Sequence, residues 1–300
     1  MSAPRRDAGA RARREVWDRH ARWWQETFTD GADPEYEHEI LPGIAAELSG
    51  CHRILDLGCG EGQVARYLLR SLPAPAAVVG IDRSVAQLAN AQLANAQLAN
   101  AQLAGDPAPH YLRGEGERLP FADASFDGVV CALVIEHAED ADAVLDEVAR
   151  VLAPGGRFVL LVNHPLLQGS GSGLVDDQIL GETYWRVGPY LDEGVTWEEV
   201  DAGVRIPFAH RPLSRYVNPL AEHDLLLVHM REPAPPAELL ATSVAPDLEQ
   251  SIPRLLAMRF EHRPRAAGPS PWVDAGTRVE ATYHRPEACD DRPSRGASDG

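Results

Sequence analysis

Short apolar runs alternate along the chain with segments whose apolar residues recur every three or four positions. The apolar runs predict β-strands and the segments between them predict helices, such as one over residues 141–152. Strands that alternate with helices predict a parallel sheet with right-handed crossovers. The predicted strands end in Asp56 and Asp82 or cover residues 110–116, 126–134, 157–163, 225–230 and 255–260.

Helical spacing also marks the region before the first strand. Apolar residues recur at this spacing over residues 15–28. A second helical segment opens at Asp33-Pro34 and continues to Leu48. Residues 15–48 are therefore expected to form a helical cover on the domain.

Both ends of the chain differ in composition from its body. Residues 1–14 are rich in Arg, Ala and Gly and predict a disordered tail, with a nucleic-acid-binding arm as the alternative. Residues 264–300 are dominated by Pro, Arg, Gly and Asp and predict a second disordered tail. The folded domain is expected over residues 15–263.

Residues 86–104 repeat the sequence Ala-Gln-Leu-Ala-Asn, the last copy being imperfect. A period of five turns a helix by about 140° per repeat, so the repeat leucines spiral around the helix and cannot all be buried. Because Ala, Gln and Leu favour helices, we predict a crossover helix whose extra turns project into solvent. Self-association of the chain through these leucines is the alternative.

A glycine-rich loop, Asp56-Leu57-Gly58-Cys59-Gly60-Glu61-Gly62, lies between a predicted strand and a helix-forming segment. Glycine lets the backbone approach a ligand closely, and the helix that follows offers free N–H groups to an anion. Asp82 ends the next strand twenty residues after Gly62, where a carboxylate can bind two ribose hydroxyls. A nicotinamide dehydrogenase shares this geometry but carries Gly-x-Gly-x-x-Gly, which this loop does not match.

The loop and the motifs after it resemble the class I S-adenosylmethionine-dependent methyltransferases, in particular the small-molecule branch with the quinone-biosynthesis enzymes (methyltransferase type 11). The resemblance implies an α/β fold with helices on both faces of a Rossmann-like seven-stranded sheet, in the order 3-2-1-4-5-7-6 with strand 7 antiparallel. It also implies that the N-terminal helices fold over the cofactor. The matching motifs are Asp56-x-Gly58-x-Gly60, Gly80-Ile81-Asp82, Gly114-Glu115-Gly116, Ser125-Phe126-Asp127, Ile135-Glu136-His137 and Pro154-Gly155-Gly156.

The resemblance further assigns residues to the cofactor, S-adenosylmethionine. Families of this type often carry Asp where this sequence has Glu115, so the sequence departs from the pattern there. The implied contacts are Asp56, Gly58 and Gly60 at the methionine end, Asp82 at the ribose, Arg83 beside the adenine, Glu115 and Gly116 at the adenine edge, and Leu133 beside the sulfonium.

His137 follows the fourth predicted strand and is the candidate catalytic base. Methyl transfer from a sulfonium is an in-line displacement that mainly requires alignment and exclusion of water. A hydroxyl acceptor must also lose a proton, and an imidazole titrates near neutrality. The alternative is that His137 only shapes the pocket or forms a hydrogen bond within the fold.

Residues 166–210 form a long excursion at the carboxyl edge of the predicted sheet, where ligands bind in such folds. We predict a substrate lid in which Tyr184–Val187 and Val195–Trp197 are the strands of an added hairpin. Tyr184 and Trp185 are then expected to give the acceptor apolar contacts.

Four other residues are candidates for substrate binding. His164 and His210 lie at the two ends of the lid segment. Trp24 and Tyr36 are expected to line a wall of the substrate cavity, with plain packing as the alternative. No cluster in the sequence has the spacing of metal ligands, so no metal is expected.

Composition narrows the class of function. The formal net charge of −17, with no basic stripe in the body of the chain, disfavours a nucleic-acid substrate. The chain contains no lysine, which excludes Schiff-base and Walker-type lysine chemistry. Its four cysteines show no paired spacing, and no apolar run approaches the about 18 residues of a membrane span. We expect a cytoplasmic protein without membrane or nucleic-acid partners.

The motifs and the composition together favour an enzyme that transfers a methyl group from S-adenosylmethionine, leaving S-adenosylhomocysteine. The acceptor is expected to be a small, aromatic or otherwise apolar metabolite, methylated at O, N or C. The alternative from another class is a regulatory or interaction protein that binds S-adenosylmethionine without transferring its methyl group.

Overall fold

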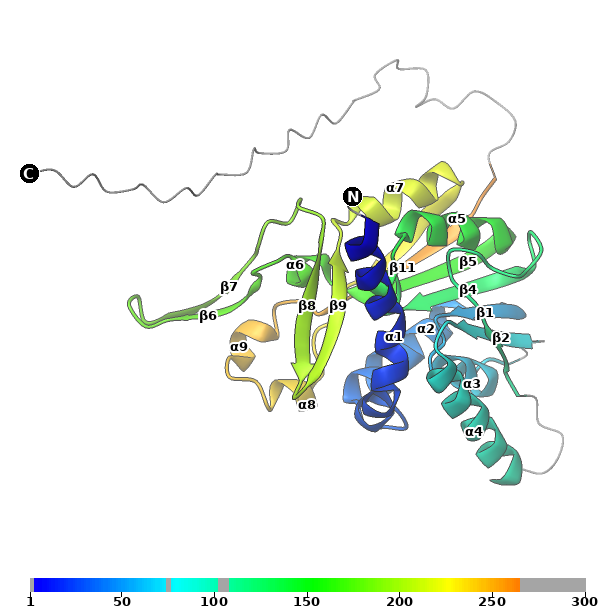
Figure 1. Cartoon of the computed structure of the whole chain (residues 1–300), viewed down its shortest axis with the longest axis horizontal. Coiled ribbons are helices and arrows are strands. Elements are labelled where there is room, and N and C mark those ends of the chain that lie inside the picture. Colours follow the sequence, from blue (N-terminus) through cyan, green and yellow to red (C-terminus); the bar gives the residue numbers. More distant parts are fainter. Residues whose placement is uncertain (1–2, 74–76, 102–107, 265–300) are drawn as a thin grey trace, which may run out of the picture. The chain divides into compact units, whose positions relative to one another are not determined.

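The structure is a computed structural model, which describes residues 3–73, 77–101 and 108–264 (Figure 1). The tail expected over residues 264–300 and the last residues of the repeat, 102–104, lie outside the described residues apart from Pro264. None of the helices in the described ranges is long and apolar enough to cross a membrane.

A seven-stranded sheet in the order β3-β2-β1-β4-β5-β11-β10 forms the centre of the fold. Neighbours from β3 to β5 pair in parallel, whereas β11 is antiparallel to both β5 and β10. The predicted sheet order and the antiparallel strand are thereby confirmed. The strands are β1 (Arg53–Leu57), β2 (Ala77–Asp82), β3 (His110–Arg113), β4 (Phe126–Ala132), β5 (Leu152–Asn163), β10 (Leu225–Arg231) and β11 (Leu255–His262).

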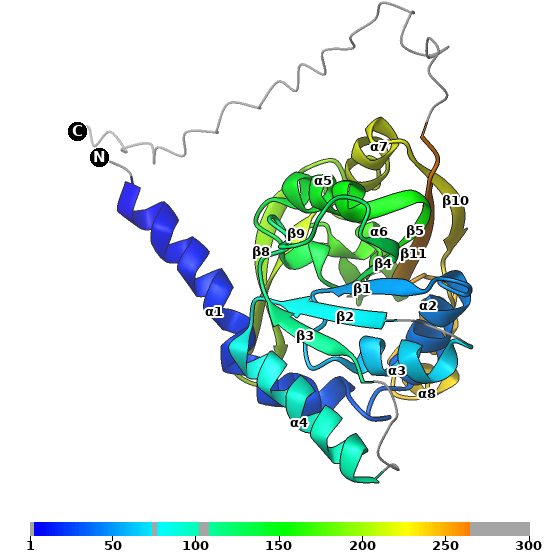
Figure 2. The same ribbon diagram turned by 90° about the vertical axis from the view of Figure 1, so that its right-hand side faces the viewer.

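Helices cover both faces of this sheet (Figure 2). Apolar residues of α5 (Ala141–Val151) and α7 (Ser214–Glu222) pack on one face, and those of α2 (Leu41–Glu47) and α3 (Gln63–Ser71) on the other. Side chains alternate between faces along a strand, so β4 supplies Val129 to one layer and Val130 to the other. The sheet therefore needs apolar residues at consecutive positions, which is the pattern that predicted its strands.

The N-terminal helices precede the sheet. The long helix α1 (Ala3–Phe28) is followed by the π-helical turn η1 (Tyr36–Ile40) and α2. Residues 3–14, expected as a tail, are described as the first part of α1, because the Ala and Arg that fill this segment favour a helix. The boundary expected at residue 15 thus lies inside a helix.

The repeat forms most of α4 (Val85–Ala101), as predicted. Leu88 is buried, with 7% of its surface exposed, whereas Leu93 is 56% exposed. This difference follows from the five-residue period, which turns successive leucines away from the sheet. The later turns of α4 extend beyond the sheet in Figure 1.

The predicted lid contains two hairpins instead of one. After α6 (Pro165–Gln168), β6 (Gly173–Asp177) pairs with β7 (Glu182–Arg186), and β8 (Gly194–Asp201) pairs with β9 (Val204–His210). The prediction that residues 184–187 pair with 195–197 is wrong, because each strand closes a short turn with its own neighbour. The turns use Gly181 and Gly203, both with positive φ.

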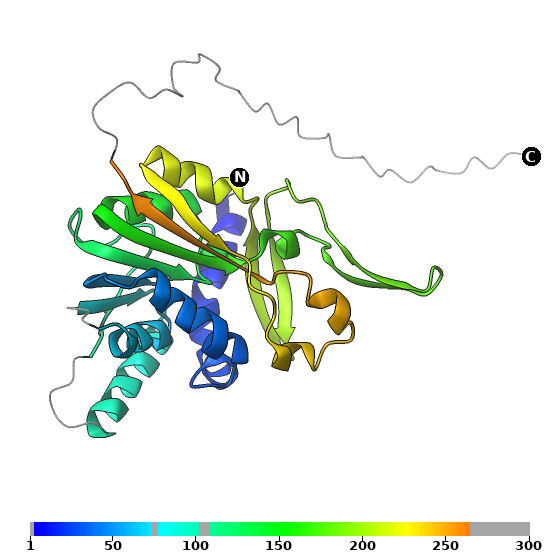
Figure 3. The ribbon, with the colours of Figure 1, turned by 180° about the vertical axis from the view of Figure 1, so that it is seen from behind.

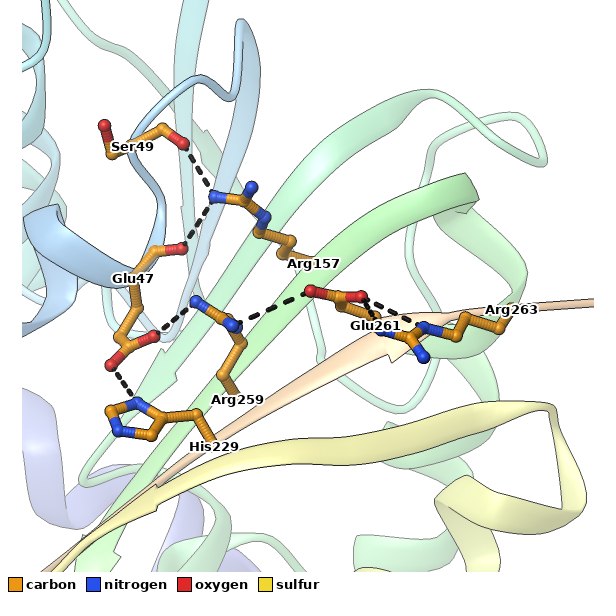
Figure 4. A network of polar contacts seen from close by, with 7 residues as sticks. All are labelled: Glu47, Ser49, Arg157, His229, Arg259, Glu261 and Arg263. Atoms are coloured by element: carbon orange, nitrogen blue, oxygen red, sulfur yellow. Dashed lines mark hydrogen bonds and ion pairs between the residues drawn. The ribbon is translucent and has the colours of Figure 1, made fainter.

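A polar network holds the end of α2 against the strands β5, β10 and β11 (Figure 4). Glu47 accepts hydrogen bonds from Arg259 Nη1 at 2.9 Å and from His229 Nδ1 at 2.6 Å. Arg157 Nη1 donates to the carbonyl oxygens of Glu47 and Ser49 at 3.2 and 2.6 Å. The network connects α2 with β5, β10 and β11. Two short helices, α8 (Ala237–Leu240) and α9 (Pro246–Glu249), lie between β10 and β11 in the chain.

Candidate active site

The glycine-rich loop connects β1 to α3 at the carboxyl edge of the sheet. The N–H groups of Gly58 and Cys59 donate to the carbonyl oxygen of Ile81 at 2.8 and 3.0 Å, which fixes the loop to β2. Gly60 has a φ of +53°, and a Cβ there would meet no atom within 4 Å because the backbone borders a cavity. A Cβ at Gly62, by contrast, would overlap the hydroxyl of Tyr111. Glycine is thus required at one position for access to the cavity and at the other for packing.

Asp82, at the end of β2, organises this loop. Its Oδ2 accepts a hydrogen bond from Gly60 N at 2.9 Å, and its Oδ1 accepts one from Ser84 N at 2.7 Å. Each carboxylate oxygen keeps a second lone pair, which fits the two hydroxyls of a ribose. Burial raises the pKa of Asp82, so a ligand that donates hydrogen bonds to the carboxylate would favour its ionised form.

Asp56, in β1, borders the same cavity. Its Oδ2 accepts a hydrogen bond from Ala65 N at 3.1 Å. Burial and, to a smaller extent, the nearby charges of Asp82 and Glu61 raise the pKa of Asp56 to about 7. Glu61 is paired with Arg66 at 2.5 Å, whereas Asp56 has no ion pair among the described residues. This end of the cavity therefore favours a cation, and the sulfonium and ammonium groups of S-adenosylmethionine fit it.

Arg83, Glu115 and Gly116 lie together at the other end of the loop. Arg83 Nε is 3.3 Å from Glu115 Oε2, and Arg83 Nη2 is 4.0 Å from Glu139 Oε1. All three predicted adenine residues line the cavity, as do Asp56, Gly58, Gly60, Asp82 and Leu133. Leu133 has a positive φ of 56°, a strained conformation just after β4.

Aromatic side chains from the N-terminal helices form a second wall of this cavity. We call Trp17, Trp24 and Tyr36, which all line it, the aromatic wall. The rings of Trp17 and Trp24 are 5.5 Å apart, and those of Trp24 and Tyr36 are 6.2 Å apart, both edge to face. Trp24 and Tyr36 therefore border this cavity, and both also belong to the apolar cluster around α2 and α3, so their role as substrate residues stays a prediction.

Side-chain hydrogen bonds join helix α1 to two other segments of the chain. Trp23 Nε1 donates to Asp201 Oδ2 in β8 at 2.9 Å. Asp18 Oδ1 accepts hydrogen bonds from Ser84 Oγ at 2.7 Å and from Ala86 N at 3.0 Å, at the start of α4. The helix therefore bridges the second lid hairpin and the segment that follows Asp82.

His137 lies in the 3₁₀ turn η2 (Ile135–His137) and faces the cavity. Its Nδ1 donates to the carbonyl oxygen of Pro207 at 2.8 Å, and its ring lies 4.9 Å from Trp17 and 4.9 Å from Phe208. With the proton on Nδ1, Nε2 is an acceptor, and it has no hydrogen-bond partner among the described residues. Burial lowers the pKa of His137, so the neutral imidazole is favoured.

The other predicted substrate residues lie away from the cavity. Tyr184 and Trp185 belong to the hairpin β6–β7, which extends away from the sheet (Figure 3). His164 binds Glu232 at 2.8 Å and accepts from Leu166 N, and His210 Nε2 donates to the carbonyl oxygen of Tyr190 at 2.8 Å. None of these four residues lines the cavity, because the segment folds as two separate hairpins.

Trp17 is the one residue of the aromatic wall that was not predicted from the sequence as a substrate residue. It lies seven residues before Trp24 on α1, and a spacing of seven places both rings on one face of a helix. That spacing could have identified it. In the ranges that the structure describes, no group of three or more His, Cys, Asp or Glu side chains could hold a metal ion.

Comparisons with known proteins agree with this geometry. Residues 55–160 match the family described as methyltransferase domain. The chain is 37% identical over 134 residues to the ubiquinone/menaquinone biosynthesis C-methyltransferase UbiE of Geobacter sulfurreducens, covering 44% of this chain and 48% of that protein. It is 32% identical over 114 residues to the methyltransferase GfsG of Streptomyces halstedii, covering 38% of each. The chain thus spans about half or less of the length of these curated relatives.

Similarity to solved structures extends further along the chain. A S-adenosylmethionine-dependent methyltransferase from Mesorhizobium loti superposes with a TM-score of 0.59 at 27% identity. The match covers 73% of this chain and 96% of that protein. This match therefore extends over a larger share of the chain than the family match over residues 55–160.

Proposed function

We propose that this chain, a member of the class I S-adenosylmethionine-dependent methyltransferases, methylates a small aromatic or otherwise apolar metabolite. The observation that carries the proposal is a single cavity with two kinds of wall. The glycine-rich loop and the carboxyl groups of Asp56 and Asp82 form one wall, and the aromatic wall forms another. The quinone-biosynthesis relative supports an apolar acceptor. The described cysteines are free and buried, which fits the cytoplasm.

We assign the cofactor contacts as the resemblance implied them. Asp82 would hold the ribose hydroxyls, and Arg83, Glu115 and Gly116 the adenine. Asp56 with Gly58 and Gly60 would hold the methionine end, and Leu133 would border the sulfur. The bound cofactor supplies a methyl group whose sulfonium makes it easy to displace. The chain's own contribution is to align the acceptor and exclude water.

For a hydroxyl acceptor we assign the base role to His137. Its Nδ1–H is held by the carbonyl of Pro207, so Nε2 is the atom that can take the acceptor's proton. The ring of Trp17 lies 4.9 Å from the imidazole ring, edge to face. Acceptors that attack through carbon or a neutral amine would use the same cavity without this proton transfer.

Incubation of a metabolite extract with methyl-labelled S-adenosylmethionine tests the proposal. We expect mass spectrometry to find a labelled small molecule with the wild-type protein and none with Asp82→Ala. Calorimetry with S-adenosylhomocysteine should in parallel show binding that Asp82→Ala weakens at least tenfold, since two charge-assisted hydrogen bonds of about 1.5–3 kcal/mol each are lost. Cofactor binding without any labelled product would favour the silent regulatory alternative.

A further inference from the structure

The turn that carries His137 is held by a buried arginine from a distant part of the chain. Arg211 follows β9, and only 9% of its surface is exposed. Its Nη1 donates to the carbonyl oxygen of Ile135 at 3.0 Å, and its Nη2 donates to that of Ala138 at 3.2 Å. These two carbonyls bracket His137 along the chain. The fixed fork of a guanidinium is suited to joining two acceptors in this way.

Strand β9, which directly precedes Arg211, also holds the imidazole of His137. Pro207, in β9, supplies the carbonyl oxygen that accepts the Nδ1–H of His137. On the other side of the turn, Glu136 Oε1 accepts hydrogen bonds from the N and Nδ2 atoms of Asn163 at 3.2 and 3.0 Å. The turn is thus clamped between β5 and the end of β9, and the ring cannot rotate without breaking one of these contacts.

We propose that Arg211 is a positioning residue, which fixes the turn Ile135–Ala138 so that Nε2 of His137 faces the cavity in its acceptor form. The inference rests on the base role proposed for His137. It gives the hairpin β8–β9 a role in positioning His137, because Pro207 belongs to this hairpin and Arg211 directly follows it. Arg211 itself is not among the residues that line the cavity.

The charges around His137 give the inference a readout that is independent of turnover. Three charged groups face the imidazole: Glu136 from its own turn, Glu198 from β8 and Arg211. The carboxylates raise the pKa of His137, whereas Arg211 and, above all, burial lower it. Removing Arg211 takes away a cation and loosens the turn toward solvent. Both changes raise the pKa of His137.

The main variant is Arg211→Met, which keeps the length of the side chain without its charge or donors. We expect kcat to fall about 10–100-fold through misplacement of the base, with the affinity for S-adenosylhomocysteine changed less than about twofold. In the full chain with ¹³C-labelled histidine, the His137 signal, identified by its loss in His137→Ala, should titrate at a higher pH. Arg211→Lys keeps the charge but reaches one carbonyl at a time, so its kcat should fall while the titration stays nearer that of the wild type.

Arg157→Met is the matched control. Arg157 also donates to two backbone carbonyls, those of Glu47 and Ser49 (Figure 4). None of these three residues lines the cavity. Loss of the Arg157 contacts should lower the midpoint of thermal unfolding without changing kcat or the titration of His137. A fall in kcat in Arg157→Met as large as in Arg211→Met would mean that any loosened arginine clamp impairs the enzyme, and would overturn the specific role.

A double-mutant cycle separates action through His137 from action elsewhere. In a His137→Ala background, Arg211→Met should cause no further loss of kcat. The same fold loss in both backgrounds would overturn the inference, as would an unchanged kcat with an unchanged titration. If no transferase activity is found, the proposed function fails, and an unshifted His137 titration in Arg211→Met then refutes the role of Arg211 separately.

Discussion

Asp56 combines a buried carboxyl with two carboxylate neighbours, and the pKa of about 7 that results makes it half protonated near neutrality. A cationic ligand beside it favours the ionised form, so binding below this pKa must release a proton. The affinity for S-adenosylmethionine should therefore rise roughly tenfold between about pH 5.5 and 7.5. Calorimetry in buffers of different ionisation enthalpy measures the released proton. Asp56→Asn should bind with a flat pH dependence, and a slope equal to that of the wild type would contradict the assignment.

His137 has a pKa that burial lowers below the ordinary imidazole value. Its neutral form is the base, so kcat for a hydroxyl acceptor should rise with pH through a pKa below about 6.5 and then level off. His137→Ala should lose about 10²–10⁴-fold in kcat together with this acidic limb. Steady-state rates across pH measure both. A loss of less than tenfold with the limb retained would leave alignment as the main catalytic contribution.

At the scale of elements, α1 contributes residues to the cavity, whereas the hairpin β6–β7, which the sequence suggested as part of a lid, contributes none. Trp17 of α1 lines the cavity, whereas Tyr184 and Trp185 of β7 do not. Trp17→Ala should raise the acceptor KM roughly tenfold or more, because a buried aromatic contact of about 2 kcal/mol is lost. The double variant Tyr184→Ala with Trp185→Ala is the comparison and should leave KM unchanged. The reverse result would restore the first hairpin as a substrate lid.

Helix α4 is longer than its place in the fold requires. Its 17 residues span about 25 Å, whereas the four residues of β3 span about 13 Å. Deleting residues 91–100 removes two whole repeats and brings Ala101 to the position of the buried Ala91. We expect unchanged cofactor affinity and a change in the free energy of unfolding of less than about 1 kcal/mol, measured by chemical denaturation. Loss of folded protein would show that the repeat is structural.

For the whole molecule, local pattern predicts the sheet better than the site. The seven strands were predictable because both faces of the sheet are buried and the apolar runs are continuous. The pairing of the lid strands was not, since it depends on which turn closes first. The orientation of His137 could not be predicted from the sequence either. It depends on the backbone carbonyl of Pro207, 70 residues later in the chain, and a backbone carbonyl has no sequence signature.

The contacts of α1 have a consequence for the timing of turnover. The helix lines the cavity with Trp17 and Trp24 and is bonded to Asp201 and Ser84, and Ser84 also donates its backbone N–H to Asp82. We predict that ligands exchange while these bonds are broken and that the displacement takes place with the helix in contact. We expect the first turnover to be faster than those that follow, seen as a burst of methylated product in rapid-quench experiments. Asp18→Ala should remove the burst and make kcat insensitive to added viscogen, since opening then no longer limits the rate.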